Sequence, residues 1–114
     1  MHKDCIFCKI GAGEIPADKL YEDERVVVFN DIAPVAPVHF MVIPKEHISS
    51  LNDVENRHED LLGHMMNIAV KIAKEKGLED EGYRQVINCG RAAGQVVMHL
   101  HLHIIGGRQL EVMG

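Results

Sequence analysis

Several features that define other classes of protein are missing from this chain of 114 residues. Its 12 basic residues are outnumbered by 17 acidic ones, so it lacks the positive charge that binding to long nucleic acids requires. A single nucleotide needs only a few local donors and stays open as a ligand. No run approaches the roughly 18 consecutive apolar residues of a membrane helix. We therefore expect a protein that binds neither nucleic acid nor a membrane.

A secretion signal is also missing, because the first residues, MHKDCIFCKIGAGE, contain early charges and no long apolar segment. This predicts a cytoplasmic protein, whose thiols stay reduced. The three cysteines are an odd number, which further disfavours a disulfide framework. The spacing of Cys5 and Cys8 therefore indicates metal or redox chemistry, with a pair of small core residues as the alternative.

No internal repeat, low-complexity tract or linker divides the chain, and its length suits one compact unit, so residues 1–114 are predicted as a single domain. Runs rich in β-branched and apolar residues predict five strands. These are 19–22, 25–31, 39–44, 83–90 and 98–105. A short apolar piece at 5–10 predicts one or two helical turns.

A longer helix is expected between residues 50 and 76. Leu61, Met65, Ile68 and Ile72 recur at helical spacing and form an apolar stripe. Ser50 or Asn52 is the expected N-terminal cap, and Gly77 the end. Strands, then a helix, then strands again predict the α+β class, with an antiparallel sheet and helices on one face.

The segment VVMHLHLHIIGG alternates His99, His101 and His103 with apolar residues. On a strand the three histidines share one face, and the apolar face would pack on the long helix. The outer two histidines would be roughly 14 Å apart on a regular strand. Zinc–nitrogen bonds are only about 2 Å long, so one ion cannot readily hold all three. At least one histidine must have another role.

Other histidines extend the set of candidates. His39 and His47 flank the predicted strand 39–44 and could join Cys5 and Cys8 around a metal. His58 and His64 lie in the helical segment, where surface or edge positions are expected.

The run from His99 to Ile105 resembles the signature of the histidine triad (HIT) superfamily, in which three histidines alternate with apolar residues and an apolar pair follows. IFCKI, EIP, FNDIAPVAPVHFMVIPKEHIS, GYRQVIN and GGRQ also resemble the Hint branch, the histidine triad nucleotide-binding proteins, in order and spacing. The resemblance implies an α+β fold with a five-stranded antiparallel sheet and two helices, the sheets joined across a two-fold homodimer.

The resemblance also implies hydrolysis of nucleoside 5′-phosphoramidates, often purine ones. His101 would attack phosphorus, His103 would contact the phosphate and His39 would support the site. The positions matching nucleotide-binding residues are Phe7, Ile10, Ile15, Asn30, Asp31, Ile32, Asn88, Gly94, Gln95 and Val96. Some bacterial members bind structural zinc through positions matching Cys5, Cys8, His47 and His99.

Three positions depart from the pattern of the Hint branch. Val96 replaces a serine thought to assist the departing amine, Ala93 replaces a loop glycine, and Asn30 replaces a frequent histidine. Two alternatives to the phosphoramidase therefore stay open. One is hydrolysis of dinucleoside polyphosphates, and the other is a nucleotide-binding scaffold with little catalysis.

Overall fold

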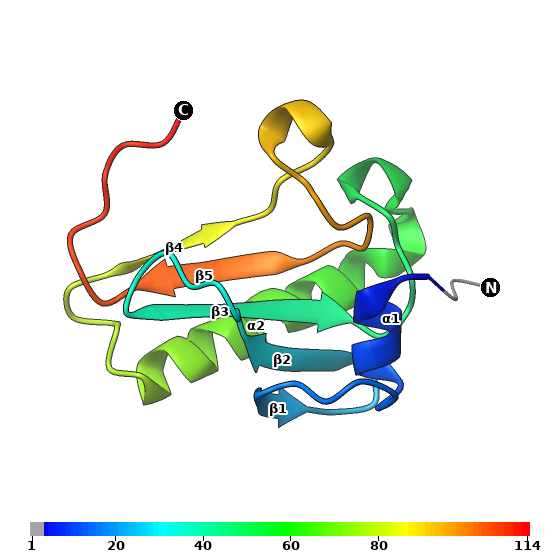
Figure 1. Ribbon diagram of the computed structural model, residues 1–114, viewed down its shortest axis with the longest axis horizontal. Helices are drawn as coiled ribbons and strands as arrows, with labels where there is room; N and C mark the ends of the chain where they lie inside the picture. The colour runs from blue at the N-terminus through cyan, green and yellow to red at the C-terminus, as the bar shows by residue number, and fades with distance from the viewer. Residues whose placement is uncertain (1–3) are drawn as a thin grey trace.

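One antiparallel sheet organises the chain, with its strands in the order β1-β2-β3-β5-β4 (Figure 1). The structure, a computed structural model, describes residues 4–114. The strands are β1 (Lys19–Glu22), β2 (Val26–Asn30), β3 (Val38–Pro44), β4 (Tyr83–Val86) and β5 (Leu102–Gly106). Every neighbouring pair is antiparallel. The predicted five-stranded α+β architecture is confirmed.

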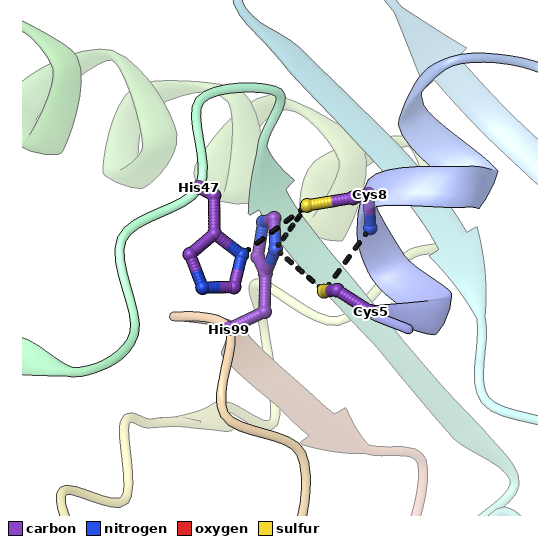
Figure 2. A group of neighbouring side chains, drawn as sticks. All are labelled: Cys5, Cys8, His47 and His99. Carbon is purple, nitrogen blue, oxygen red and sulfur yellow. Dashed lines mark hydrogen bonds between the residues drawn. The ribbon is translucent and has the colours of Figure 1, made fainter. Parts of the chain in front are cut away.

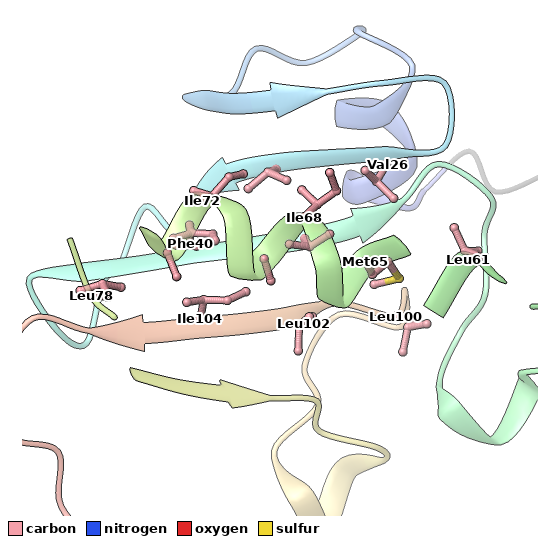
Figure 3. Packing of buried hydrophobic residues seen from close by; sticks show 14 of the residues in the cluster. Val26, Phe40, Leu61, Met65, Ile68, Ile72, Leu78, Leu100, Leu102 and Ile104 are labelled. Atoms are coloured by element: carbon pink, nitrogen blue, oxygen red, sulfur yellow. The ribbon is translucent and has the colours of Figure 1, made fainter. Parts of the chain in front are cut away.

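The long helix α2 (Glu59–Glu75) covers one face of this sheet (Figures 1 and 3). Its predicted apolar stripe packs against Val26, Phe40 and the strand residues around them. Leu100, Leu102 and Ile104 belong to the same buried cluster, as the period-two pattern predicts. Among the helices of residues 4–114, none combines the length and apolar character needed to span a bilayer.

The short helix α1 (Ile6–Gly11) lies on the opposite face, so the expectation of helices on one face is wrong. Phe7 and Ile10 pack against the side chains of Val27, Phe29, Met41 and Ile43. The reason lies in β2 and β3, whose consecutive residues are apolar rather than alternating, so both faces of these strands need cover.

The start of α2 also differs from the prediction. Two 3-10 turns, Leu51–Asp53 and Asn56–His58, precede the helix, and Ser50 caps the first turn by accepting from the N–H of Asn52. Val54 and Glu55 have extended backbone angles, which interrupt the helical path. The end is close to the prediction, since Gly77 follows the last turn with φ +75°.

Two of the predicted strands are shorter by four residues at one end, while β2 is shorter by one residue at each end. β4 ends at Val86 instead of residue 90, and β5 begins at Leu102 instead of residue 98. Between them, a 3-10 turn at Arg91–Ala93 is flanked by Gly90 and Gly94, both with positive φ. His99 and His101 therefore lie in the segment that enters β5, and His103 lies on the strand itself.

Candidate active site and metal centre

Two cysteines and two histidines converge beside α1 (Figure 2). Cys5 and Cys8 come from the start of the helix, His47 from the loop after β3, and His99 from the segment before β5. One ligand atom of each residue lies within 4.8 Å of the others. Four residues that the sequence marks as metal ligands are thus brought together from three separate parts of the chain.

The distances inside this cluster suit a tetrahedral ion. Cys5 Sγ lies 3.2 Å from His99 Nδ1, and Cys8 Sγ lies 3.2 Å from His47 Nδ1 and 3.5 Å from His99 Nδ1. Zinc bond lengths place sulfur and nitrogen ligands about 3.5 Å apart around a tetrahedron. A set of two thiols and two imidazoles closes such a tetrahedron without an open position, as structural zinc sites do.

The far nitrogens of both imidazoles are held from outside the cluster. Nε2 of His99 lies 2.8 Å from the carbonyl oxygen of Pro44, and Nε2 of His47 lies 3.2 Å from Oγ of Ser49. A carbonyl can only accept, so the neutral His99 ring carries its proton on Nε2 and a lone pair on Nδ1. That lone pair faces the sulfur atoms, as metal coordination requires.

The protonation of Cys8 is consistent with the same use. Burial, together with the neighbouring Cys5 thiol, raises the pKa of Cys8 to about 11. Without a cation this sulfur therefore stays protonated near neutral pH. A coordinated dication reverses that preference, because a ligating thiol loses its proton outright.

His101 is a buried ring with one nitrogen fixed by the main chain. Its Nδ1 lies 2.6 Å from the carbonyl oxygen of His99, and its ring packs edge-on against Phe7 with centroids 5.1 Å apart. The carbonyl accepts the Nδ1 proton, which leaves a lone pair on Nε2. A neutral imidazole held in this way is a nucleophile at neutral pH.

His39 and His103 form a second pair, next to His101. Nε2 of His39 lies 2.9 Å from Nδ1 of His103, and Oδ2 of Asp31 lies 3.3 Å from the same Nε2. On its other side, Nδ1 of His39 accepts from the N–H of Val35 at 3.2 Å. Because a backbone N–H can only donate, the neutral His39 ring carries its proton on Nε2 and directs it toward His103.

Both rings of this pair are neutral at neutral pH. Burial lowers the pKa of His39, and the Asp31 carboxylate opposes that effect. Burial, followed by His101 and His39, lowers the pKa of His103 to about 4. The second nitrogen of His103 then carries its proton, because its Nδ1 accepts from His39. The ring can donate from Nε2 to an anionic oxygen such as that of a phosphate.

Asp31, His39 and His103 also bring ligand-type atoms within 4.8 Å of one another. The Val35 N–H on Nδ1 of His39 decides against a metal there. It leaves the proton on Nε2, so the neutral ring has no lone pair to give on that side. A hydrogen bond from Nε2–H of His39 to Nδ1 of His103, and not a metal ion, accounts for the 2.9 Å between these two nitrogens.

The loop after β4 is fastened by Gln95. Its side-chain oxygen accepts from the N–H of Gly90, and its side-chain nitrogen donates to the carbonyls of Ser49 and Val97. The carboxamide is thus engaged inside the protein, and the backbone N–H groups of Gly94 and Gln95 donate to the carbonyls of Arg91 and Gly90 within the loop. Val96 is 87% exposed and offers no hydroxyl.

The positions matched to nucleoside contacts fall into two groups. Phe7 and Ile10 are the buried residues of α1, and Ile15 packs at the edge of the same apolar cluster. Asn30, Asp31 and Ile32 follow one another where β2 ends. The Asn30 amide donates to Asp18, and Ile32 is fully exposed. Asn88 is half-buried in the segment that follows β4.

His58 is buried, so the expectation of a surface position is wrong for it. Its Nδ1 accepts from the N–H of Glu55, and its Nε2 lies 3.0 Å from Oε2 of Glu46, which Arg57 also binds. These contacts fasten the loop that carries His47. His64 lies half-buried at the edge of α2, with Nε2 2.6 Å from Oδ2 of Asp23.

Main-chain partners were missed by sequence reasoning. The carbonyls of Pro44 and His99 and the N–H of Val35 fix the ring nitrogens of three histidines. Every residue except proline carries both groups, so no residue type in a motif marks them.

The fold and the two histidine clusters match the arrangement expected for the histidine triad class. A family profile described as "Scavenger mRNA decapping enzyme C-term binding" (DcpS_C) matches residues 4–112. A protein of Escherichia coli strain K12 named purine nucleoside phosphoramidase is 45% identical over 113 residues, which cover 99% of this chain and 95% of that protein.

Solved structures agree. A histidine triad protein from Clostridium difficile has a TM-score of 0.95 and 49% identity, over 100% of this chain and 99% of its own. A zinc-bound histidine triad family protein from Mycobacterium smegmatis has a TM-score of 0.80 and 37% identity, over 93% and 76%. The chain belongs to the histidine triad (HIT) family.

Proposed function

We propose that this protein hydrolyses purine nucleoside 5′-phosphoramidates through a covalent nucleotidyl intermediate on His101. The observation that carries the proposal is the 2.6 Å contact between Nδ1 of His101 and the His99 carbonyl, which leaves a lone pair on Nε2. The name of the Escherichia coli relative, purine nucleoside phosphoramidase, supports the substrate class.

In the first step Nε2 of His101 attacks phosphorus, and the phosphorus–nitrogen bond breaks. The ring becomes positively charged, and the His99 carbonyl on Nδ1–H stabilises that charge. His103 donates from Nε2 to a phosphate oxygen. Gly94 and Gln95 already donate their backbone N–H groups to the carbonyls of Arg91 and Gly90, so in this proposal the N–H of Val96 is the loop donor to the phosphate. Water then attacks the same phosphorus, breaks the bond to His101 and releases the nucleoside monophosphate.

The departing amine needs a proton, and two of the candidate proton donors can be excluded. Val96 has no hydroxyl, and both ring nitrogens of His99 are engaged by the cysteines and by Pro44. We infer that solvent water supplies the proton. The rate should therefore depend on the basicity of the amine more steeply than in a relative with serine at this position.

The nucleoside is assigned to the other end of the site. Asp31, at the end of β2, can accept from both ribose hydroxyls once its carboxylate turns from His39. Phe7, Ile10 and Ile15 offer an apolar surface for the base. Asn30, Ile32 and Asn88 complete the proposed contacts.

The proposal includes a structural zinc ion on Cys5, Cys8, His47 and His99. The unprotonated Nδ1 of His99, which faces the two sulfur atoms, and the spacing of the four ligand atoms support it, as does the zinc-bound relative from Mycobacterium smegmatis. The ion would tie α1 to the segments around β3 and β5 and take no part in the chemistry. Thiolate ligands suit a reducing cytoplasm. A two-fold homodimer, as the family resemblance implies, belongs to the same proposal.

Replacing His101 tests the mechanism. The variant His101→Ala should release no amine from adenosine 5′-phosphoramidate and still bind adenosine monophosphate, because the phosphate and ribose contacts remain. His64→Ala, which alters a histidine on the opposite face of the sheet, is the control and should keep its turnover. Persisting turnover in His101→Ala would contradict the mechanism.

Val96 favours one alternative, a nucleotide-binding protein with little catalysis. That alternative predicts tight binding of nucleoside monophosphates with negligible turnover, even when the leaving amine is a weak base. A series of adenosine phosphoramidates with amines of graded basicity separates the two functions. Diadenosine polyphosphates in the same assay test the other hydrolase activity.

A further inference from the structure

The segment 107–109, which directly follows β5, has no role in the proposed chemistry, yet it lies against the loop that precedes His39. Gly107 has φ +95°, and a Cβ built there would meet Cβ of Pro37 at 3.0 Å. Only glycine therefore lets the two segments pass this closely. The turn at Gly107 brings Arg108 beside the loop between β2 and β3.

Arg108 binds that loop through the carbonyl of Val35, which belongs to the peptide group directly after the one that carries the Val35 N–H. Its Nη2 donates to the carbonyl of Val35 at 2.8 Å, and its Nη1 donates to the carbonyl of Gln109 at 2.9 Å. The loop is also fastened at its start, where Oδ1 of Asp31 accepts from the N–H of Ala33 at 2.8 Å. Arg108 is therefore a clamp on the far end of the loop, close to His39.

Val35 connects this clamp to the active site. Its N–H donates to Nδ1 of His39, and Nε2 of His39 is 2.9 Å from Nδ1 of His103. In this series of hydrogen bonds each donor points from Val35 toward His103, because the first donor is a backbone N–H that cannot accept. The last ring in the chain consequently presents a donor at its Nε2, as contact with a phosphate oxygen requires.

We propose that Arg108 is a positioning residue that holds the Val35 amide against His39, and so keeps the His103 proton on Nε2. The proposal rests on the proposed function, in which His103 donates to the substrate phosphate. Neutral rings are the condition for it, and burial lowers the pKa of both His39 and His103. Without the clamp, the loop would release the amide, and both rings would exchange between tautomers.

Three variants test this role. Arg108→Ala removes both guanidinium contacts, and Arg108→Lys keeps one donor for the Val35 carbonyl. Arg84→Ala is the matched control, because Arg84 also donates to a main-chain carbonyl, that of Glu111 in the C-terminal segment, without contacting Val35. Both arginine side chains lie outside the buried core, so folded protein is expected for all three variants.

The readout is the protonation of each ring nitrogen, measured by long-range ¹H–¹⁵N correlation on protein labelled at histidine. Wild type and Arg84→Ala should show a protonated Nε2 and a bare Nδ1 for both His39 and His103. Arg108→Ala should show averaged nitrogen signals for the two rings, and Arg108→Lys should restore the wild-type pattern.

Kinetics provide the second readout. Loss of one aligned hydrogen-bond donor to the phosphate should lower kcat about fivefold in Arg108→Ala, with KM changed by less than about twofold. Wild-type nitrogen signals and wild-type kcat in Arg108→Ala would overturn the proposal, as would equal changes in Arg84→Ala. If wild-type protein fails to turn over phosphoramidates, the proposed function falls, and the nitrogen signals still decide the role of Arg108.

Discussion

His99 and His39 are buried histidines in neighbouring clusters, and the main chain treats them in opposite ways. Behind His99 lies a carbonyl, that of Pro44, which accepts a hydrogen bond from Nε2–H. Nδ1 is therefore unprotonated, and its lone pair faces Cys5 and Cys8. Behind His39 lies an N–H, that of Val35, which donates to Nδ1 and leaves the ring proton on Nε2, the nitrogen that faces His103. One ring can bind a cation, and the other can pass on a hydrogen bond.

His101 follows the first pattern for a different purpose. A carbonyl again accepts the hydrogen bond from the ring N–H, and the unprotonated Nε2 is the nucleophile in the proposed mechanism instead of a metal ligand. The three histidines of the triad thus differ less in their own chemistry than in the single main-chain atom, or neighbouring ring, behind each one.

The largest expected effect concerns the cluster that contains His99 and the two cysteines, the candidate metal site. Cys8→Ser replaces a thiolate by a hydroxyl, which is a poor zinc ligand, so zinc should disappear from protein purified without added metal. Loss of a structural ion should lower the free energy of unfolding by at least about 3 kcal/mol. Elemental analysis and thermal denaturation measure the two effects.

Cys89→Ser is the control for this change. Cys89 is a half-buried thiol outside the cluster, so the same substitution there should leave zinc content unchanged. Zinc retained at wild-type level in Cys8→Ser would show that the four residues do not hold the ion.

A smaller effect separates the second cluster from the first. His39→Leu should keep full zinc content, because His39 takes no part in the cysteine cluster, and should lower kcat roughly tenfold through loss of the ordered donor to His103. Steady-state turnover of adenosine 5′-phosphoramidate and elemental analysis of the same preparation measure both. Loss of zinc together with activity would mean that the clusters are not independent.

The smallest expected effect concerns acid stability. The pKa of His103 is lowered to about 4, below that of an unfolded histidine, so the unfolded chain binds the extra proton first as the pH falls. The resulting stability is fully present above about pH 6.5 and decreases as the pH falls toward 4. His103→Asn should weaken this dependence by a few degrees in Tm, with no difference in slope above pH 7. An unchanged acid dependence in thermal melts would contradict the buried, neutral state of His103.

Much of the fold could be predicted because it depends on side-chain periodicity. Leu100, Leu102 and Ile104 needed only the period of two to be assigned to the core, and α2 only its apolar stripe. The face on which α1 lies could also have been predicted, because the unbroken apolar run in β2 indicates a strand that is covered on both faces. The start of α2 could not be predicted, because a serine such as Ser50 caps a 3-10 turn as well as it caps an α-helix.

The candidate site divides in the same way. The spacing of the cysteines and histidines could be read from the chain, because side-chain identity carries it. The direction of each proton could not, since it depends on Pro44, His99 and Val35 through backbone groups brought near by the fold. Arg108 is an intermediate case: its position after two glycines is visible in the sequence, and its contact with Val35 is not.

The wide separation of the cysteine cluster along the chain has a consequence for synthesis. Cys5 and His99 are 94 positions apart, and Cys8 and His47 are 39 apart. A growing chain on the ribosome holds the first three ligands well before the fourth is made. Zinc captured early would keep an open position, and the site would close only after β5 follows His99 out of the ribosome. A filled tetrahedron is therefore a mark of a completed molecule.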